Sequence, residues 1–389
     1  MPSKKRQHYV PKFYLRNFAS DKEQRTINIY TLKASKFISN ASLRDQCYKD
    51  YYYGKDGKIE KAFEKIEGPI SQVFDNIIKG NQLPNRFSPE HSLLISYVVL
   101  QIVRTENAEM EVNYTVDQLV KKLYAKELEE EGILNDKVTI NDFSIKLTDP
   151  MRLLFSSAAN APIAMDLNYK VFRDKSNTGF ITSDNPTVRY NQLFQHKKNE
   201  GDKTGLATTG LQIFLPISPS HCLIFYDEKA YRIGNRKDAI VPITRSENVD
   251  QINGLQITTC LNNIYCSMKC SRLYISNLLG QYLPLRRKEM TALNEYPAAD
   301  TIDGHEAIIL HSYRPKVNHN LHLDNVKQLM NPEFILRDNK MVHLRNEQFV
   351  RFHRAFMQEV DAGRYKASEF ERFGKDWEAG LIHPNESRF

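Results

Sequence analysis

Apolar residues recur at helical spacing in the first part of the chain. Between residues 59 and 77 they return every three or four positions, which predicts a helix with a buried stripe. Within this stripe Gly68-Pro69 predicts a break or a kink, with two helical pieces that meet at Glu67, because a proline cannot donate a backbone hydrogen bond. The run 88–103 is apolar on nearly all sides after a capped start, so it predicts a central helix that continues past Glu129.

The hydrophobic pattern changes from helical to strand-like near residue 168. Short apolar runs bounded by turn residues predict strands at 169–173, 179–182, 211–216, 222–226, 230–233 and 264–268. The acidic and basic residues at 227–229 are typical of a hairpin turn between two of these runs. A helix is expected at 246–261, and the tail carries two amphipathic stripes, 349–360 and 370–377.

These patterns predict an α+β fold in three regions. A mostly helical region, 1–165, packs on a mixed or antiparallel sheet formed mainly by the β-rich region, 166–330, and helices of region 331–389 complete the core. At 389 residues, with 41% hydrophobic and 26% charged residues, the chain is long enough and apolar enough to bury such a core.

The composition also indicates in which cellular compartment the protein is expected. No apolar run approaches the roughly 20 residues of a membrane-spanning helix, and the basic start is followed by polar and aromatic residues rather than by the apolar core of a secretory signal. Five cysteines argue against a disulfide framework. We therefore expect a cytoplasmic protein without a membrane partner.

The positive charge is concentrated at the start of the chain. The formal net charge is +7, and residues 1–60 contain 13 Lys and Arg against 6 Asp and Glu, which accounts for all of it. Aromatic residues are interleaved with these cations, and such a mixture can contact phosphates and bases. The sequence thus predicts a nucleic-acid partner for residues 1–60, with contacts from Lys4, Lys5, Arg6, Lys12 and Arg16; the alternative is an ordinary solvated terminus leading into a core helix.

Two explanations account for the charged residues near the predicted central helix. An arginine at its end, Arg104, requires a carboxylate if it is buried, and Glu67 could form a purely structural salt bridge with it. Alternatively, His8 and Asp184 join them in a catalytic site. In that site His8 transfers protons, Glu67 and Asp184 bind Mg²⁺ or Mn²⁺ or act as a base, and Arg104 binds an anion.

Asp184 has a structural explanation of its own. The run Ser183-Asp184-Asn185-Pro186 is also typical of a turn in which the carboxylate accepts backbone N–H groups. Elsewhere the chain lacks the glycine-rich fingerprints of dinucleotide and phosphate-binding loops, the HExxH zinc motif and a Gly-x-Ser-x-Gly elbow, so no nucleotide cofactor is indicated.

Several runs resemble one known family. The run 7–18, QHYVPKFYLRNF, resembles the opening motif of a bacterial family catalogued only as domain of unknown function 4238. Further similar pieces follow in order, over about residues 7–270: the tyrosines at 51–53, Glu60 and Glu67, Gln101 with Arg104-Thr105, and the runs 180–186 and 215–219. The chain departs from the pattern at Glu106, where a proline is expected. The resemblance implies no mechanism, because the family's activity is not established.

Two functions therefore remain open. The first is a metal-assisted nuclease or related phosphodiesterase, acting as a toxin-like or anti-phage effector. The second is a non-catalytic module that uses its basic start to bind nucleic acid or a protein partner. The protein partner could be a second copy of the chain. In the second case the Glu67–Arg104 pair is structural and His8 is a core histidine.

Overall fold

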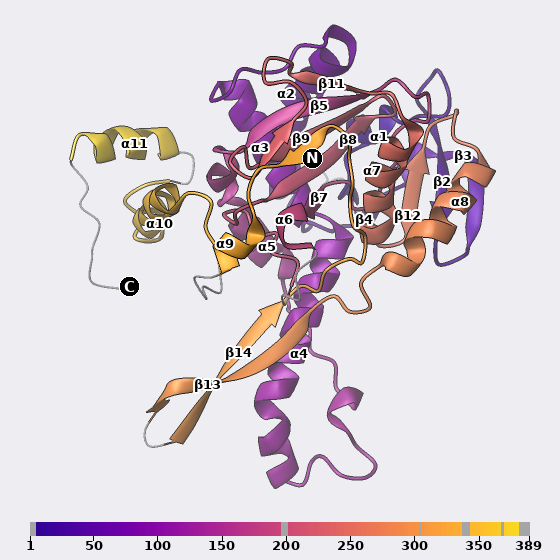
Figure 1. The fold of residues 1–389 in the computed structure, drawn as a ribbon. Helices are drawn as coiled ribbons and strands as arrows, with labels where there is room; N and C mark the ends of the chain where they lie inside the picture. The colour runs from indigo at the N-terminus through magenta and orange to yellow at the C-terminus, as the bar shows by residue number, and fades with distance from the viewer. Residues whose placement is uncertain (1–4, 196–200, 303–304, 337–342, 367–368, 381–389) are drawn as a thin grey trace.

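The computed structural model describes residues 5–195, 201–302, 305–336, 343–366 and 369–380. Its helices surround one mixed and one antiparallel sheet, which confirms the predicted α+β class (Figure 1). Among the described residues, no helix is long and apolar enough to cross a membrane.

A five-stranded sheet forms the centre of the molecule. Its strands lie in the order β11 (Ile240–Ile243), β5 (Asn168–Asp174), β9 (His221–Tyr226), β8 (Gln212–Ser218) and β7 (Val188–Tyr190). Only the β11–β5 pair is parallel; the other neighbours are antiparallel. Every residue of β8 and β9 is buried, as expected for strands covered on both faces.

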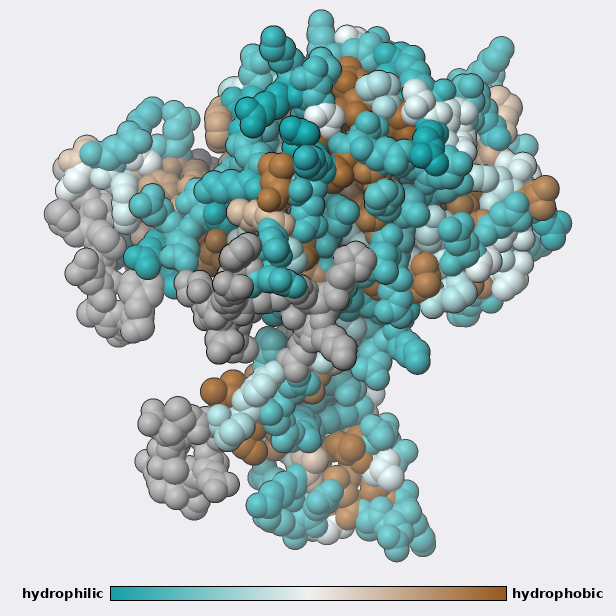
Figure 2. Space-filling view, viewed as in Figure 1, coloured by the Kyte–Doolittle hydropathy of each residue, from teal (hydrophilic) through white to brown (hydrophobic). Residues whose placement is uncertain are grey.

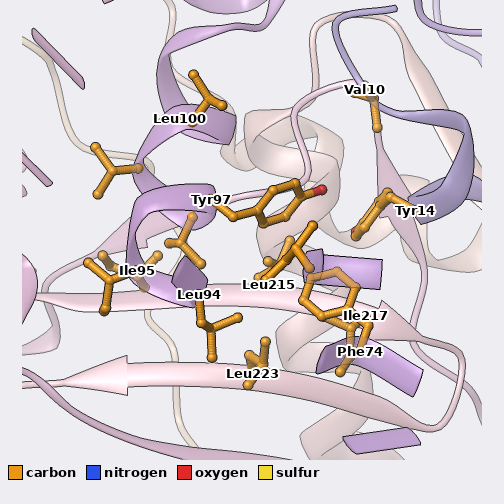
Figure 3. Close-up of a cluster of buried hydrophobic side chains, with 14 of the residues drawn as sticks. Val10, Tyr14, Phe74, Leu94, Ile95, Tyr97, Leu100, Leu215, Ile217 and Leu223 are labelled. Carbon is orange, nitrogen blue, oxygen red and sulfur yellow. The ribbon is translucent and has the colours of Figure 1, made fainter. Parts of the chain in front are cut away.

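The two faces of this sheet contact different helices, because side chains alternate along a strand. On one face, Leu215 and Leu223 join a cluster with residues of α1 (Lys12–Arg16), α2 (Lys58–Gly80) and α3 (Pro89–Val103). Figure 3 shows this cluster, in which Tyr14 and Tyr97 lie above the strands. On the other face, Phe214 and Ile224 pack with residues of α7 (Ser246–Thr259).

A second, antiparallel sheet lies beside the first. It has the order β3 (Lys36–Ser42), β2 (Thr26–Thr31), β12 (Asn263–Cys266) and β6 (Thr182–Ser183). Helices α7 and α8 (Arg272–Tyr282) pack beside it in a cluster that includes Ile264 and Leu278. Gly254 is required where these helices meet, since a Cβ atom there would lie 2.4 Å from the Tyr282 ring.

The predicted break at Gly68-Pro69 is wrong. Helix α2 continues through Pro69 to Gly80. The apolar residues before and after the proline, among them Phe63, Ile70 and Phe74, are all buried in one cluster. We infer that this shared burial outweighs the one hydrogen bond that Pro69 cannot make.

The predicted central helix ends earlier than expected. α3 stops at Val103, and a new helix, α4 (Glu106–Glu130), begins after Arg104 and Thr105. The Thr105 side chain accepts the Ala108 N–H at 3.2 Å and thus caps α4. α5 (Pro150–Ala158) starts after Asp149, whose side chain accepts the Arg152 N–H at 3.0 Å.

The hairpin predicted at 227–229 is also wrong. β10 (Tyr231–Ile233) does not pair with β9 but with β15 (Val326–Gln328), almost one hundred residues later. Two other short strands, β1 (Arg6–His8) and β4 (Tyr48–Asp50), pair near the start of the chain. Long-range pairing of this kind leaves no local sequence signal.

An extension projects from the body of the molecule (Figure 1). It consists of α4 and a long hairpin, β13 (Ala292–Ile302) with β14 (His305–Tyr313), which no pattern in the sequence predicted. Thr115 and Thr291 share a hydrogen bond of 2.6 Å at its root. Figure 2 shows hydrophobic residues on its surface, and Leu123 and Ile308 are each 62% exposed.

The described C-terminal helices form a small cluster of their own. α10 (Glu347–Asp361) and α11 (Phe370–Glu378) pack through Phe356 and Phe373, as the two amphipathic stripes predicted. Short helices α6 (Gln192–Gln195) and α9 (Pro332–Leu336) complete the α-helices of the described residues. The Arg345 guanidinium anchors the start of this tail through a forked pair with Asp166, at 2.6 and 2.9 Å.

Buried histidines make the stability of this fold depend on pH. Burial lowers the pKa of His8, His91, His221 and His319 to about 4, from 6.5, so each is neutral in the native protein at neutral pH. As pH falls through 6.5 the unfolded chain binds these protons and the native chain does not. Asp184 has the opposite effect, because burial raises its pKa to about 6. As pH falls through 6, the native protein binds one proton at Asp184 that the unfolded chain does not bind.

We therefore expect the free energy of unfolding to fall by roughly 3–5 kcal/mol between pH 7 and pH 5, after allowance for partial solvent screening. Unfolding should take up about three protons near pH 5. Urea unfolding followed by circular dichroism over this range measures both quantities. A level stability between pH 7 and pH 5 would show that the histidines are not held neutral.

Candidate functional site

A buried arginine joins three segments near the start of the chain. Arg104, at the end of α3, is 1% exposed. Its guanidinium donates to Glu67 Oε1 of α2 at 3.0 Å and to the main-chain oxygen of His8 at 2.7 Å. It also lies 4.2 Å above the centre of the Phe63 ring. The structural salt bridge between Glu67 and Arg104 is thus confirmed.

The surroundings of Arg104 keep it charged. Burial alone would lower its pKa, but the nearby Tyr53 and Glu67 raise it above the ordinary value. The Tyr53 hydroxyl lies 3.4 Å from Arg104 Nε and 3.3 Å from the Arg104 main-chain oxygen. Glu67 is partly open to solvent, with a side chain that is 28% exposed. The arrangement stabilises a buried cation and leaves it no free face for a substrate anion.

His8 reaches this cluster through its backbone rather than through its ring. The imidazole Nε2 lies 3.2 Å from the main-chain oxygen of Arg44 and donates to it. Burial lowers the His8 pKa to about 4, further assisted by the charges of Lys12, Arg104 and Arg6. At neutral pH the ring is therefore a neutral core group with a satisfied hydrogen bond.

Asp184 holds a turn beside the second sheet, directly after β6. Its carboxylate accepts the backbone N–H groups of Leu261, Asn262 and Asn263, at 2.8, 2.7 and 2.7 Å. The prediction of a carboxylate that accepts backbone N–H groups is confirmed, but these groups belong to the distant connection between α7 and β12 rather than to the turn of Asp184 itself. Burial raises the Asp184 pKa to about 6, and the three hydrogen bonds oppose that shift.

The two predicted metal ligands have different partners. Glu67 binds Arg104, and both oxygens of Asp184 accept backbone hydrogen bonds. Within the described ranges, no group of three or more His, Cys, Asp or Glu side chains is arranged to bind a metal ion. A Mg²⁺ or Mn²⁺ requirement stays a prediction for which these two residues offer no joint site.

The predicted nucleic-acid contacts lie on the surface, except Lys4, which is outside the described residues. Lys5 pairs with Asp50 at 3.1 Å and Arg6 with Asp45 at 2.5 Å. Lys12 and Arg16 are exposed on α1, four residues apart and hence on the same helix face. Together with Arg44, these described cations form what we call the N-terminal basic surface: Lys5, Arg6, Lys12, Arg16 and Arg44.

One group of charged residues gave no signal in the sequence. Arg189, Arg287 and Arg314 line a single cavity with Glu111 and Asp202. The three arginines come from separate segments of the chain. Arg189 lies on the edge strand β7, Arg287 lies before β13, and Arg314 follows β14. Because these segments are far apart in the sequence, no residue spacing predicts that the three side chains meet.

The fold and site define a class of α+β proteins in which a buried arginine ties an N-terminal strand to two helices beneath a mixed sheet. The family model described as protein of unknown function (DUF4238) matches residues 6–269, which is more than half of the chain. The chain belongs to this family. The match covers the Arg104 cluster, Asp184 and both main sheets. No curated protein and no solved structure matches the chain.

Removal of Arg104 should destabilise the protein strongly. Arg104→Ala leaves Glu67 and the His8 carbonyl without their partner and is expected to lower the free energy of unfolding by roughly 3–5 kcal/mol. Glu67→Gln should cost only about 1 kcal/mol, because Glu67 is partly exposed and glutamine can still accept a hydrogen bond. Urea unfolding of both variants and of the double variant gives the coupling energy. Additive effects would contradict the bridge.

Replacement of Asp184 tests the turn that it holds. Asp184→Asn removes the negative charge and turns an amide N–H₂ towards backbone N–H groups, so we expect a loss of roughly 2–3 kcal/mol in unfolding free energy. The exposed Asp136, changed to Asn, is the matched control and should leave stability unchanged within about 0.5 kcal/mol. Equal stability of the two variants would show that the carboxylate is not structural.

Proposed function

We propose that this protein is a non-catalytic binding module that recognises nucleic acid through the N-terminal basic surface. One observation carries the proposal: Arg104, Glu67 and Asp184 use their side chains in internal contacts, and His8 uses both its ring and its carbonyl, whereas the cations beside them face solvent. Of the two functions that the sequence leaves open, this arrangement favours the binding module.

The basic surface combines charge with aromatic rings. The Arg6 guanidinium lies 4.7 Å above the centre of the Tyr48 ring, and Lys55 Nζ lies 5.7 Å from that of Tyr51. Tyr51 is 36% exposed. Cations of this kind neutralise phosphates, and exposed rings can stack on unpaired bases.

Acidic neighbours moderate the positive charge. Asp50 and Asp45 pair with Lys5 and Arg6, whereas no salt bridge of Lys12 or Arg16 is found among the described residues. A nucleic acid would therefore compete with exposed ion pairs at one end of the surface and meet the cations of α1 directly. Since exposed pairs contribute little energy, this competition costs little and makes binding sensitive to salt.

The proposal includes a cytoplasmic location, which rests on the composition of the sequence. The role of a toxin-like or anti-phage effector belongs to the nuclease alternative and stays a prediction with it. Metal-assisted cleavage stays a prediction, and the same experiment tests it.

The test uses the full chain with end-labelled single- and double-stranded DNA and RNA, in Mg²⁺, Mn²⁺ or chelator. We expect a salt-sensitive mobility shift that persists in chelator, without cleavage. Lys12→Ala with Arg16→Ala should weaken the shift and lower the salt slope by about one for each cation that no longer binds a phosphate.

The matched control is Lys126→Ala with Lys137→Ala, which removes the same charge from an exposed part of the molecule away from the basic surface. If both double variants weaken binding equally, binding depends on the net charge of the protein and not on the N-terminal basic surface. The absence of any shift would overturn recognition of nucleic acid and leave a protein partner. Metal-dependent cleavage would overturn the non-catalytic assignment.

A further inference from the structure

A cavity of about 340 Å³ lies at the root of the extension, and neither Arg104 nor Asp184 lines it. Helices α3, α4, α5 and α7 form part of its wall, and β7, residues 202–204 and the segments that flank the β13–β14 hairpin also line it. Its volume falls in the range of small-molecule sites in proteins, which begins at roughly 300 Å³.

Three arginines face this space with only two carboxylates. Arg314 uses both of them, since its Nε donates to Asp202 Oδ2 at 2.6 Å and its Nη1 lies 3.5 Å from Glu111 Oε2. Arg314 also donates to the Thr204 hydroxyl at 2.7 Å. Both carboxylates of the cavity therefore form their ion pairs with Arg314, and their charges also act on Arg189 and Arg287.

The other two guanidinium groups keep free donors. Among the described residues, Arg189 makes one weak hydrogen bond, from a terminal nitrogen to the Thr204 carbonyl at 3.4 Å. For Arg287 no hydrogen bond or ion pair occurs within the described part of the chain. Burial lowers the pKa of both groups to about 10, and repulsion from Arg314 adds to the effect. Both nevertheless stay charged at neutral pH, so the cavity holds an excess of positive charge.

An unsatisfied hydroxyl in the same wall is a second, independent sign of a ligand. Thr187 is 4% exposed and lines the cavity, yet its Oγ1 has no hydrogen-bond partner among the described residues. A buried polar group without a partner costs about 1–3 kcal/mol in proteins, so such groups are rare unless something absent from the structure binds them.

Both polar and apolar side chains line the rest of the cavity. The apolar ones include Val103, Val112, Leu154 and Leu255. A small inorganic ion would satisfy the arginines but leave these side chains uncovered. The wall therefore matches an organic body attached to the anionic group.

We propose that this cavity binds a small organic phosphate, with its phosphate oxygens held by Arg189, Arg287 and the Thr187 hydroxyl and its organic part against the apolar side chains of the wall. A phosphate has enough oxygens to accept from two guanidinium forks and a hydroxyl together, whereas a carboxylate has only two. This site goes beyond the proposed recognition of nucleic acid and uses different residues.

The test measures ligand binding to the full chain by calorimetry and by the shift in melting temperature. The probes are adenosine 5′-monophosphate, uridine 5′-monophosphate and ribose 5-phosphate, with adenosine, inorganic phosphate and citrate as comparisons. At least one organic phosphate should bind and stabilise the protein, adenosine should not, and inorganic phosphate should bind more weakly.

Two variants locate the site. Arg287→Gln should weaken binding by roughly ten- to a hundredfold, because it removes a charged donor that has no described protein partner. Thr187→Val should weaken binding several-fold while the free protein stays at least as stable, since the hydroxyl that it removes is unsatisfied. Arg351→Gln, which removes an exposed arginine of α10, is the matched control and should bind normally.

Three outcomes would overturn the proposal: no organic phosphate binds, citrate binds better than every phosphate, or Arg287→Gln binds as tightly as the unmodified chain. The two proposals fail separately. Arg287→Gln should leave the nucleic-acid shift unchanged, and the Lys12 and Arg16 variant should leave ligand binding unchanged.

Discussion

The packing of the first hundred residues depends on one buried charge. A guanidinium removed from water must be paired and hydrogen-bonded, and Arg104 meets this requirement only when β1, α2 and the end of α3 come together. The ring of Phe63 covers its remaining face. Arg104 therefore sets the position of the N-terminal strand, although that strand contributes only three residues and pairs with one short neighbour.

The cost of burying charge also explains why the candidate catalytic residues make internal contacts. Charged and polar side chains that are spaced among apolar runs tend to become buried with them, and burial forces each to find a partner inside the protein. Glu67 and Asp184 found theirs in a guanidinium and in three backbone N–H groups. Residues that look catalytic in a sequence can thus be polar groups whose internal hydrogen bonds and salt bridges replace the water lost on burial.

Periodicity predicted most elements whose burial is local. The stripe of α2, the strands β5, β8 and β9, and the two C-terminal helices follow from spacing alone. The prediction failed where distant contacts decide the structure: tertiary packing carries α2 through Pro69, and β10 pairs with a strand almost one hundred residues away. The Glu67–Arg104 bridge was predictable because a buried arginine needs an acid. The arginine cavity was not, since its members share no segment.

The family match ends at residue 269, so α8 and all later elements of the structure lie outside it. Arg189 and Thr187 lie within the matched region, whereas Arg287 and Arg314 follow it. The cavity is thus assembled from both parts of the chain: the matched part supplies Arg189 and Thr187, and the part that follows supplies Arg287 and Arg314. Divergence of that segment between family members would change what the cavity accepts and leave the central sheet as it is.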